Sequence, residues 1–215
     1  MSERVTVSND ADSQVEDRRG DFPRIRPVEP PASFGPFVEA MRTLQDLAVA
    51  VDAPEAVLAD AVTQANALID LLAPHEAAEG VAYAGRAVAL PGRGNLLMPP
   101  WQIEQFDKAG VRARGVLRRY HLGGGAAAHG GVLPLIFDDN FGMVVYAAKR
   151  PISRTAYLHV DYRKVTPLNV PLVIEGSVDR FEGRKTWVRS KLTLEDGTLL
   201  AEGEGLMIQL LPGQP

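Results

Sequence analysis

The stretch His129–Gly142 combines residue types that can do chemistry with a segment that should be buried. Gly130 and Gly131 begin it, the chain after them is almost wholly apolar, and two adjacent acids, Asp138 and Asp139, interrupt that apolar run. A helix that is hydrophobic all round is a buried helix, and carboxylates rarely enter such a place unpaired. An acid in a core, just after a glycine turn that can begin a helix, predicts a catalytic site.

Composition limits the kinds of partner and chemistry that fit this chain. It has 215 residues, 46% of them hydrophobic and 23% charged, and a net charge of −4. Such a chain suits one good-sized soluble domain, alone or with an appendage. The chain is mildly acidic and has no basic run, so we expect no nucleic-acid partner. There is no cysteine, which excludes disulfides, cysteine metal sites and a cysteine nucleophile.

Metal and membrane signals are also missing from the sequence. The four histidines show no metal-ligand spacing. They are His75, His121, His129 and His159. No apolar run approaches the ~20 residues needed to span a membrane, and no apolar segment of a secretory signal begins the chain. The sequence therefore predicts a cytoplasmic protein that does not cross a membrane.

The first third of the chain divides into a tail and a helical extension. Residues 1–32 are polar and then rich in proline, which predicts a disordered or loosely attached tail. Residues 33–80 carry two amphipathic patterns, the second with Asp52 as its N-cap and Glu55 three positions later. We expect a helical hairpin that packs on the main domain as an added layer. The alternative is a lid, or one wall of a binding groove.

Residues 81–215 have the texture of a sheet with one helix inside it. The central helix should begin after the two glycines and end near residue 148, before a proline. Strand patterns cover residues 81–90, 111–120, 155–163, 172–181, 185–195 and 198–211. A strong hairpin signal, Asp196-Gly197, separates the last two strands. One helix followed by antiparallel strands predicts an α+β fold, in which a long antiparallel sheet holds one buried helix.

The chain resembles the hotdog-fold acyl-CoA thioesterases of the PaaI-like group, to which the thioesterase-superfamily-member proteins also belong. The matching motifs, in chain order, are His129-Gly130-Gly131, an acid nine positions after the histidine (Asp138), Asn140-Phe141-Gly142, Thr155, Tyr162-Arg163, Pro167, Glu175-Gly176, Asp196-Gly197 and Ala201. They cover about residues 81 to 212. The resemblance implies a curved antiparallel sheet wrapped around one long helix. It also implies homodimers, often paired into homotetramers, with active sites at the subunit interface.

The resemblance further implies a reaction, the hydrolysis of a fatty or aryl acyl-CoA to free acid and coenzyme A, without metal or cofactor. Asp138 acts there as general base or as nucleophile, and the residues do not separate these routes. Gly130, with Gly131, supplies the oxyanion hole, because the first amides of a helix are unsatisfied donors. Thr155 helps to place the attacking water, and His129 orients the glycine turn or contacts substrate.

Each role has a structural alternative. Asp138 can instead cap a neighbouring loop, and Thr155 can simply favour the start of a strand. Asp139 points about 100° further round the helix, so we expect it to be structural or to face the dimer interface. Arg163 and Lys164 are candidates for binding the phosphates of coenzyme A, or they form an exposed strand end.

One departure from the resemblance concerns the loop before His129. Many relatives carry an asparagine there, but residues 123–128 of this chain are only glycine and alanine. Asn95, in an earlier loop, is a candidate substitute. At ~1.5 Å rise per residue, Gly130 and Asp138 lie roughly 12 Å apart on one helix. A single thioester cannot span that distance, which predicts a dimer with two shared sites.

Two other functions stay open at this point. The first is a hotdog protein that binds acyl-CoA or an acyl carrier without cleaving it. The second is a dehydratase or hydratase, for which His129 and Asp138 lack the usual spacing.

Overall fold

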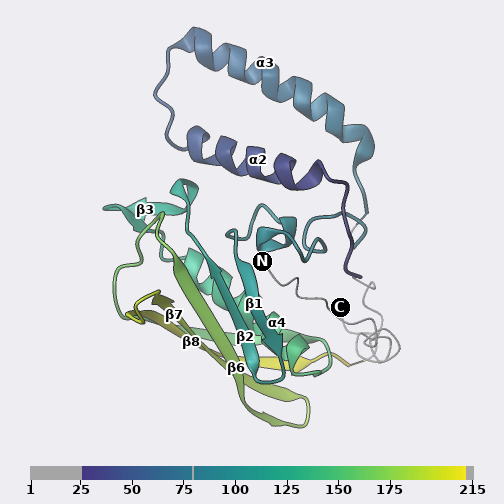
Figure 1. Ribbon diagram of the computed structural model, residues 1–215, viewed down its shortest axis with the longest axis vertical. Coiled ribbons are helices and arrows are strands. Elements are labelled where there is room, and N and C mark those ends of the chain that lie inside the picture. Colours follow the sequence, from purple (N-terminus) through teal and green to yellow (C-terminus); the bar gives the residue numbers. More distant parts are fainter. Residues whose placement is uncertain (1–25, 79, 212–215) are drawn as a thin grey trace, which may run out of the picture.

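The computed structural model describes residues 26–78 and 80–211, and its centre is a six-stranded antiparallel sheet curved around one helix (Figure 1). In spatial order the strands are β1 (Gln102–Asp107), β2 (Gly110–Gly115), β6 (Leu172–Glu182), β7 (Lys185–Leu194), β8 (Leu199–Gln209) and β5 (Ser153–Tyr162). Two short strands, β3 (Leu122–Gly124) and β4 (Ala127–Ala128), pair within the predicted glycine loop. The predicted α+β architecture is confirmed.

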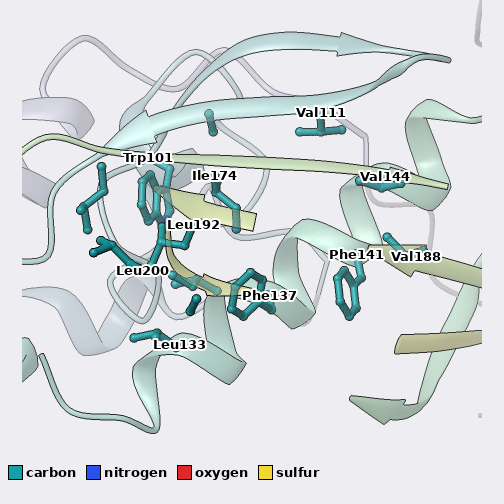
Figure 2. Packing of buried hydrophobic residues seen from close by; sticks show 14 of the residues in the cluster. Trp101, Val111, Leu133, Phe137, Phe141, Val144, Ile174, Val188, Leu192 and Leu200 are labelled. Carbon is teal, nitrogen blue, oxygen red and sulfur yellow. The ribbon is translucent and has the colours of Figure 1, made fainter. Parts of the chain in front are cut away.

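The helix inside the sheet is α4 (Val132–Ala147), and its apolar side forms the centre of the core. Phe137 and Phe141 are completely buried, and Figure 2 shows both rings on this helix, among side chains of the surrounding strands. The expectation of a helix buried on all sides is wrong. Asp138, Gly142 and Tyr146 are exposed. Residues four apart share one helix face, and the single sheet covers only the opposite one.

Glycines on β8 allow the sheet to approach the helix closely. A Cβ atom on Gly203 would lie 2.8 Å from the Phe137 ring, and one on Gly205 would lie 2.6 Å from the Phe141 ring. The Gly205 position is also closed by backbone, since its Cβ would lie 2.9 Å from the carbonyl oxygen of Tyr157. The two phenylalanine rings therefore occupy the space that side chains would need at both positions.

Gly205→Ala should consequently lower the free energy of unfolding by about 1–3 kcal/mol, the usual cost of overpacking a core. Urea unfolding followed by circular dichroism measures this change. Gly124→Ala is the matched control, because a Cβ there meets no atom within 4 Å, and it should stay within about 0.5 kcal/mol of the wild type. Equal stability of the two variants would contradict the close packing of β8 on α4.

The helical extension consists of α2 (Phe34–Ala48), α3 (Glu55–Leu72) and a short 3-10 turn, η3 (Ala73–His75). α2 packs on the main domain through the buried Val38 and Arg42. Asp46 of α2 also accepts a hydrogen bond from the Arg118 guanidinium at 2.7 Å. The predicted added layer is thus present for α2. α3 lies on the far side of α2 from the sheet (Figure 1), and none of its 18 residues, all of them described, is buried.

Two expectations for this extension need correction. The N-cap position of the second helix is Pro54, not Asp52, and no side chain caps this end; the fixed φ of proline suits the start of a helix. The sequence was expected to hold no apolar run long enough to span a membrane, yet Glu55–His75 meets that criterion by length and composition, with none of the segment buried. Length and composition alone are weak evidence of a span, because core helices of soluble proteins meet the same criterion.

The segment before β1 is not a strand, contrary to the prediction for residues 81–90. It forms successive turns and a 3-10 turn, η4 (Pro91–Gly94). Left-handed glycines, among them Gly85 and Gly92, explain why no strand forms there. Residues 1–25 of the predicted tail lie outside the described residues. Its end is attached to this segment, since the Val28 amide donates to the carbonyl of Arg86 at 3.0 Å.

Candidate active site

Asp138 and Thr155 form a hydrogen-bonded pair on the exposed face of α4. The Thr155 hydroxyl donates to Asp138 Oδ1 at 2.6 Å. Thr155 lies near the start of β5, where the register with β8 shifts between Thr155 and Tyr157. Such a bulge redirects a side chain and is common beside active sites. The structure therefore brings together two of the predicted catalytic residues, which are 17 positions apart in the chain.

This pair lines a cavity of about 690 Å³. Its volume lies in the range of small-molecule and cofactor sites. Much of the remaining wall is apolar and comes from Ile103, Phe106, Met143, Ile152 and Met207. Four arginines, Arg86, Arg93, Arg150 and Arg154, also line it. A carboxylate, an apolar wall and several cations fit a ligand that has both an apolar chain and anionic groups.

Asp139 has a different partner from Asp138. The Arg93 guanidinium binds both of its carboxylate oxygens, with distances of 3.1 Å to Oδ2 and 2.5 Å to Oδ1. This two-point geometry is the strong form of the arginine–carboxylate pair. Asp139 thus attaches the η4 segment to α4 and so acts structurally, which leaves Asp138 as the acid that pairs with Thr155.

The loop that carries Arg93 is itself held by α2 through Arg42. The buried guanidinium of Arg42 donates to the carbonyls of Pro91 at 2.9 Å and Asn95 at 3.2 Å. Arg93 has a left-handed φ of 55°, an unfavourable conformation for a residue with a side chain. Sequence reasoning missed this wall of the site. Its one visible signal was an arginine between two glycines, Gly92 and Gly94.

At the start of α4, the glycine turn is shaped by two side chains. The Gly131 amide donates to His129 Nδ1 at 3.0 Å, so His129 orients the turn. The Tyr162 hydroxyl donates to the Gly130 carbonyl at 2.9 Å. Within residues 26–78 and 80–211, the Gly130 amide has no hydrogen-bond partner. Of the two predicted donors, Gly130 is therefore available to an oxyanion, whereas Gly131 is already engaged.

Three predicted substrate-binding residues do not reach the Asp138 cavity. Asn95 Oδ1 accepts a hydrogen bond from the Leu97 amide at 2.9 Å and so shapes its own loop. This contact engages only the side-chain oxygen, and Asn95 is not among the residues that line the cavity. Arg163, half-exposed, pairs with Glu202 at 2.9 Å. Arg163 and Lys164 directly follow Tyr162, which places them at the Gly130 end of the helix.

A buried histidine, His121, is hydrogen-bonded to the residue that precedes the glycine turn. His121 is 6% exposed, and its carbonyl accepts the His129 amide at 2.7 Å. Its Nδ1 accepts the Arg118 amide at 2.9 Å. Burial lowers the pKa of His121 to about 4; the backbone hydrogen bond with Arg118 and the charge of Asp46 oppose this shift, and the charges of Arg118 and Arg42 reinforce it. The folded protein therefore holds this ring neutral under conditions in which the unfolded chain protonates it.

The free energy of unfolding should decrease as the pH is lowered, because of His121. Above pH 6.5, the ordinary pKa of a histidine side chain, the ring is neutral in both states and its contribution is complete. As the pH falls from 6.5 towards 4, only the unfolded chain binds the proton, which costs roughly 2 kcal/mol between pH 7 and pH 5. Urea unfolding at the two pH values measures this loss.

His121→Asn should flatten that dependence, because the asparagine Oδ1 can accept the same amide without taking a proton. His159→Asn is the control, since His159 is exposed at 62% of its side chain, and it should keep the wild-type slope. An unchanged slope in His121→Asn would exclude His121 as the source.

Within the described part of the chain, no group of three or more histidine or acidic side chains could hold a metal ion.

Comparison with known proteins gives the following. No family model matches the chain. It is 33% identical over 88 residues to acyl-coenzyme A thioesterase THEM4 of Rattus norvegicus and 32% identical over 88 residues to that of Mus musculus. Each match covers 40% of this chain and 37% of the relative, so the chain spans little more than a third of the relatives it matches. A crystal structure of a thioesterase superfamily protein superposes with a TM-score of 0.72 at 23% identity, over 86% of this chain and 95% of that one. The predicted hotdog fold is therefore confirmed.

Proposed function

We propose that this protein, which has the hotdog fold of thioesterase-superfamily proteins, is an acyl-CoA thioesterase that hydrolyses a fatty or aryl acyl-CoA. The observation that carries the proposal is the Thr155–Asp138 pair on the wall of a largely apolar cavity. The unpartnered amide of Gly130 at the start of the same helix supplies a second element that acyl transfer needs. The similarity to proteins named acyl-coenzyme A thioesterase supports the same class of substrate.

In the proposed reaction, the thioester carbonyl binds at the Gly130 amide while its carbon faces Asp138. Asp138 accepts a proton from water, whose oxygen attacks the carbonyl carbon, and Thr155 holds the carboxylate in place through its hydrogen bond. The C–S bond then breaks, giving the free acid and the thiol of coenzyme A. Direct attack by the Asp138 carboxylate, followed by hydrolysis of the anhydride, is the alternative route.

The two parts of this site require two chains. Gly130 and Asp138 are eight residues apart on one helix, or roughly 12 Å, too far for one thioester carbonyl to contact both. β5 is an edge strand of the sheet, and edge strands offer unpaired backbone groups to another chain. Thr155 lies near one end of β5 and Tyr162 at the other. Antiparallel pairing of two β5 strands would place Thr155 of one subunit beside Tyr162 of the other.

Since Tyr162 binds the Gly130 carbonyl, that pairing would bring each helix start to the Asp138 cavity of the other subunit. The proposed unit is a homodimer with two shared sites, or a tetramer built from it. Arg163 and Lys164 would then lie at the entrance of each site, where they are candidates for binding the phosphates of coenzyme A.

The direct test incubates the purified chain with acyl-CoAs of graded chain length and with an aryl acyl-CoA, while a thiol-trapping dye reports released coenzyme A. Thiol release from at least one substrate is expected, and release from none would contradict the proposal. A ligand-induced rise in Tm without thiol release would indicate a hotdog protein that binds acyl-CoA and does not cleave it.

A further inference from the structure

The outermost element of the molecule, α3, carries a continuous apolar face that is exposed. At about 100° per residue, seven apolar residues fall within roughly 60° of Ala65. They are Leu58, Ala61, Val62, Ala65, Leu68, Ile69 and Leu72. Val62 and Ile69 are each 60% exposed. Among the described elements, the only one that α3 contacts extensively is η3, its own continuation.

α2 has a matching face on the side away from its buried residues. Six apolar residues of α2 have the same spacing as the apolar face of α3, and each lies 21 positions before its counterpart in α3. They are Phe37, Ala40, Met41, Leu44, Leu47 and Ala48. Leu44 is 51% and Leu47 is 60% exposed. Large contiguous apolar surfaces of this kind mark interaction sites, and here two adjacent helices each present one.

The charges of α3 argue against a lipid surface as the partner. Its charged residues, Glu55, Asp60 and Asp70, are all acidic, and the helix contains neither lysine nor arginine. Helices that lie on membranes usually carry basic residues that attract anionic lipids. Asp60 and Asp70 also lie about 140° from Ala65, so the apolar face itself is free of charge.

The order of side chains along this face is self-complementary. We propose that α3 binds α3 of a second copy of this chain, antiparallel, with the two-fold axis passing beside Ala65. Leu58 then lies opposite Leu72 of the other copy, and Ala61 lies opposite Ile69. Ala65 meets its own counterpart, and this small residue lets the two backbones approach closely at the axis. A two-fold interface requires such reciprocal contacts.

Interface size shows that α2 must contribute as well. A stable interface takes about 800 Å² and roughly 20 to 30 residues from each partner, more than the seven residues of the α3 face supply. The exposed face of α2 extends the surface, so the assembly is a bundle of two α2 and two α3 helices. This contact is separate from β5 and does not rest on the proposed reaction. Both contacts together assemble four chains.

Cysteine cross-linking tests the proposed axis directly, because the chain contains no cysteine of its own. Ala65→Cys should form a disulfide-linked dimer on mild oxidation, visible on a non-reducing gel, since the residue faces itself across the axis. Ala67→Cys is the matched control, because Ala67 lies on the same helix about 160° away from Ala65 and should not cross-link. Failure of Ala65→Cys to cross-link, or equal cross-linking of both variants, would overturn the proposal.

A second arm measures mass by light scattering on the full chain. Ala65→Arg places two like charges at the axis and should halve the mass relative to the wild type, whereas Ala67→Arg should leave it unchanged. Thiol release from acyl-CoA, where the wild type shows it, should persist in both variants, because β5 is untouched. If Ala65→Arg has the same mass as the wild type, the proposal is overturned. The proposal would also be overturned if the wild type co-sedimented with phosphatidylcholine–phosphatidylglycerol vesicles and Ala65→Arg did not. The apolar face would then bind lipid.

Discussion

Asp138→Asn is expected to lower kcat for acyl-CoA hydrolysis by about 100- to 10,000-fold, the usual contribution of a general acid or base. Asparagine keeps an oxygen that accepts the Thr155 hydroxyl, whose bond to Asp138 Oδ1 measures 2.6 Å. It cannot take a proton from water or form an acyl anhydride. Because Asp138 is exposed, the free energy of unfolding should stay near that of the wild type. Initial rates of thiol release, together with urea unfolding, measure both effects.

The neighbouring acid provides a control with the opposite expected outcome. Asp139→Asn removes the negative charge from the ion pair with Arg93. The side chains of Arg93 and Asp139 are each only about one-fifth exposed. The substitution should cost about 1–3 kcal/mol of stability while reducing kcat by less than about tenfold. If both variants lose activity equally and Asp138→Asn also unfolds more easily, Asp138 is a structural residue. Comparison of the Asp138 and Asp139 variants thus distinguishes an effect on kcat from an effect on the free energy of unfolding.

Much of the sheet could be predicted from local patterns. Alternation and turn signals indicated the strands after residue 150, and the Asp196-Gly197 turn has the expected form, with a left-handed Gly197 and the Thr198 amide bound to Asp196. The glycine turn and its helix were equally visible. These features depend on neighbours within a few positions, so a sequence carries them directly.

The exposure of the central helix could not be predicted in this way. Apolar residues surround α4, but the sheet reaches only one side, and the face with Asp138 and Gly142 lines a cavity instead. Periodicity reports which residues are apolar and does not report how many layers the chain builds. A helix that a second subunit would cover has the same composition as one that its own chain covers.

The cavity wall that contains Arg93 could not be predicted from the sequence, for a different reason. The Arg93–Asp139 pair joins residues 46 positions apart, and the Arg42 contacts with Pro91 and Asn95 join residues 49 and 53 positions apart. No local pattern signals such long-range polar contacts. Asn95 takes part in these contacts through its backbone carbonyl, which accepts from Arg42, while its side-chain oxygen accepts from the Leu97 amide.

Mixed dimers of two inactive variants should regain activity, because each proposed site takes its carboxylate from one chain and its oxyanion amide from the other. Gly130→Val should be inactive because its side chain blocks approach to the amide, while the fold tolerates it: a Cβ at Gly130 meets its nearest atoms, on Tyr162, at 3.8 Å. Asp138→Asn lacks the acid. A heterodimer of the two contains one intact site and one doubly defective site, so it should show about half of the wild-type rate by two-fold symmetry.

Co-expression with two different affinity tags and sequential purification isolates that heterodimer, and thiol release measures its rate. The matched control pairs Asp138→Asn with Thr155→Val, since both changes lie in the same half of the site. Every site in that heterodimer has a defective half, so its rate should be the mean of the two single-variant rates and should not exceed that of the faster variant. Recovery in the first mixture alone would place Gly130 and Asp138 of one site on different chains. Inactivity of both mixtures, with folded subunits and an active wild type, would mean that one chain forms the whole site, and the geometry of α4 would then need another donor close to Asp138.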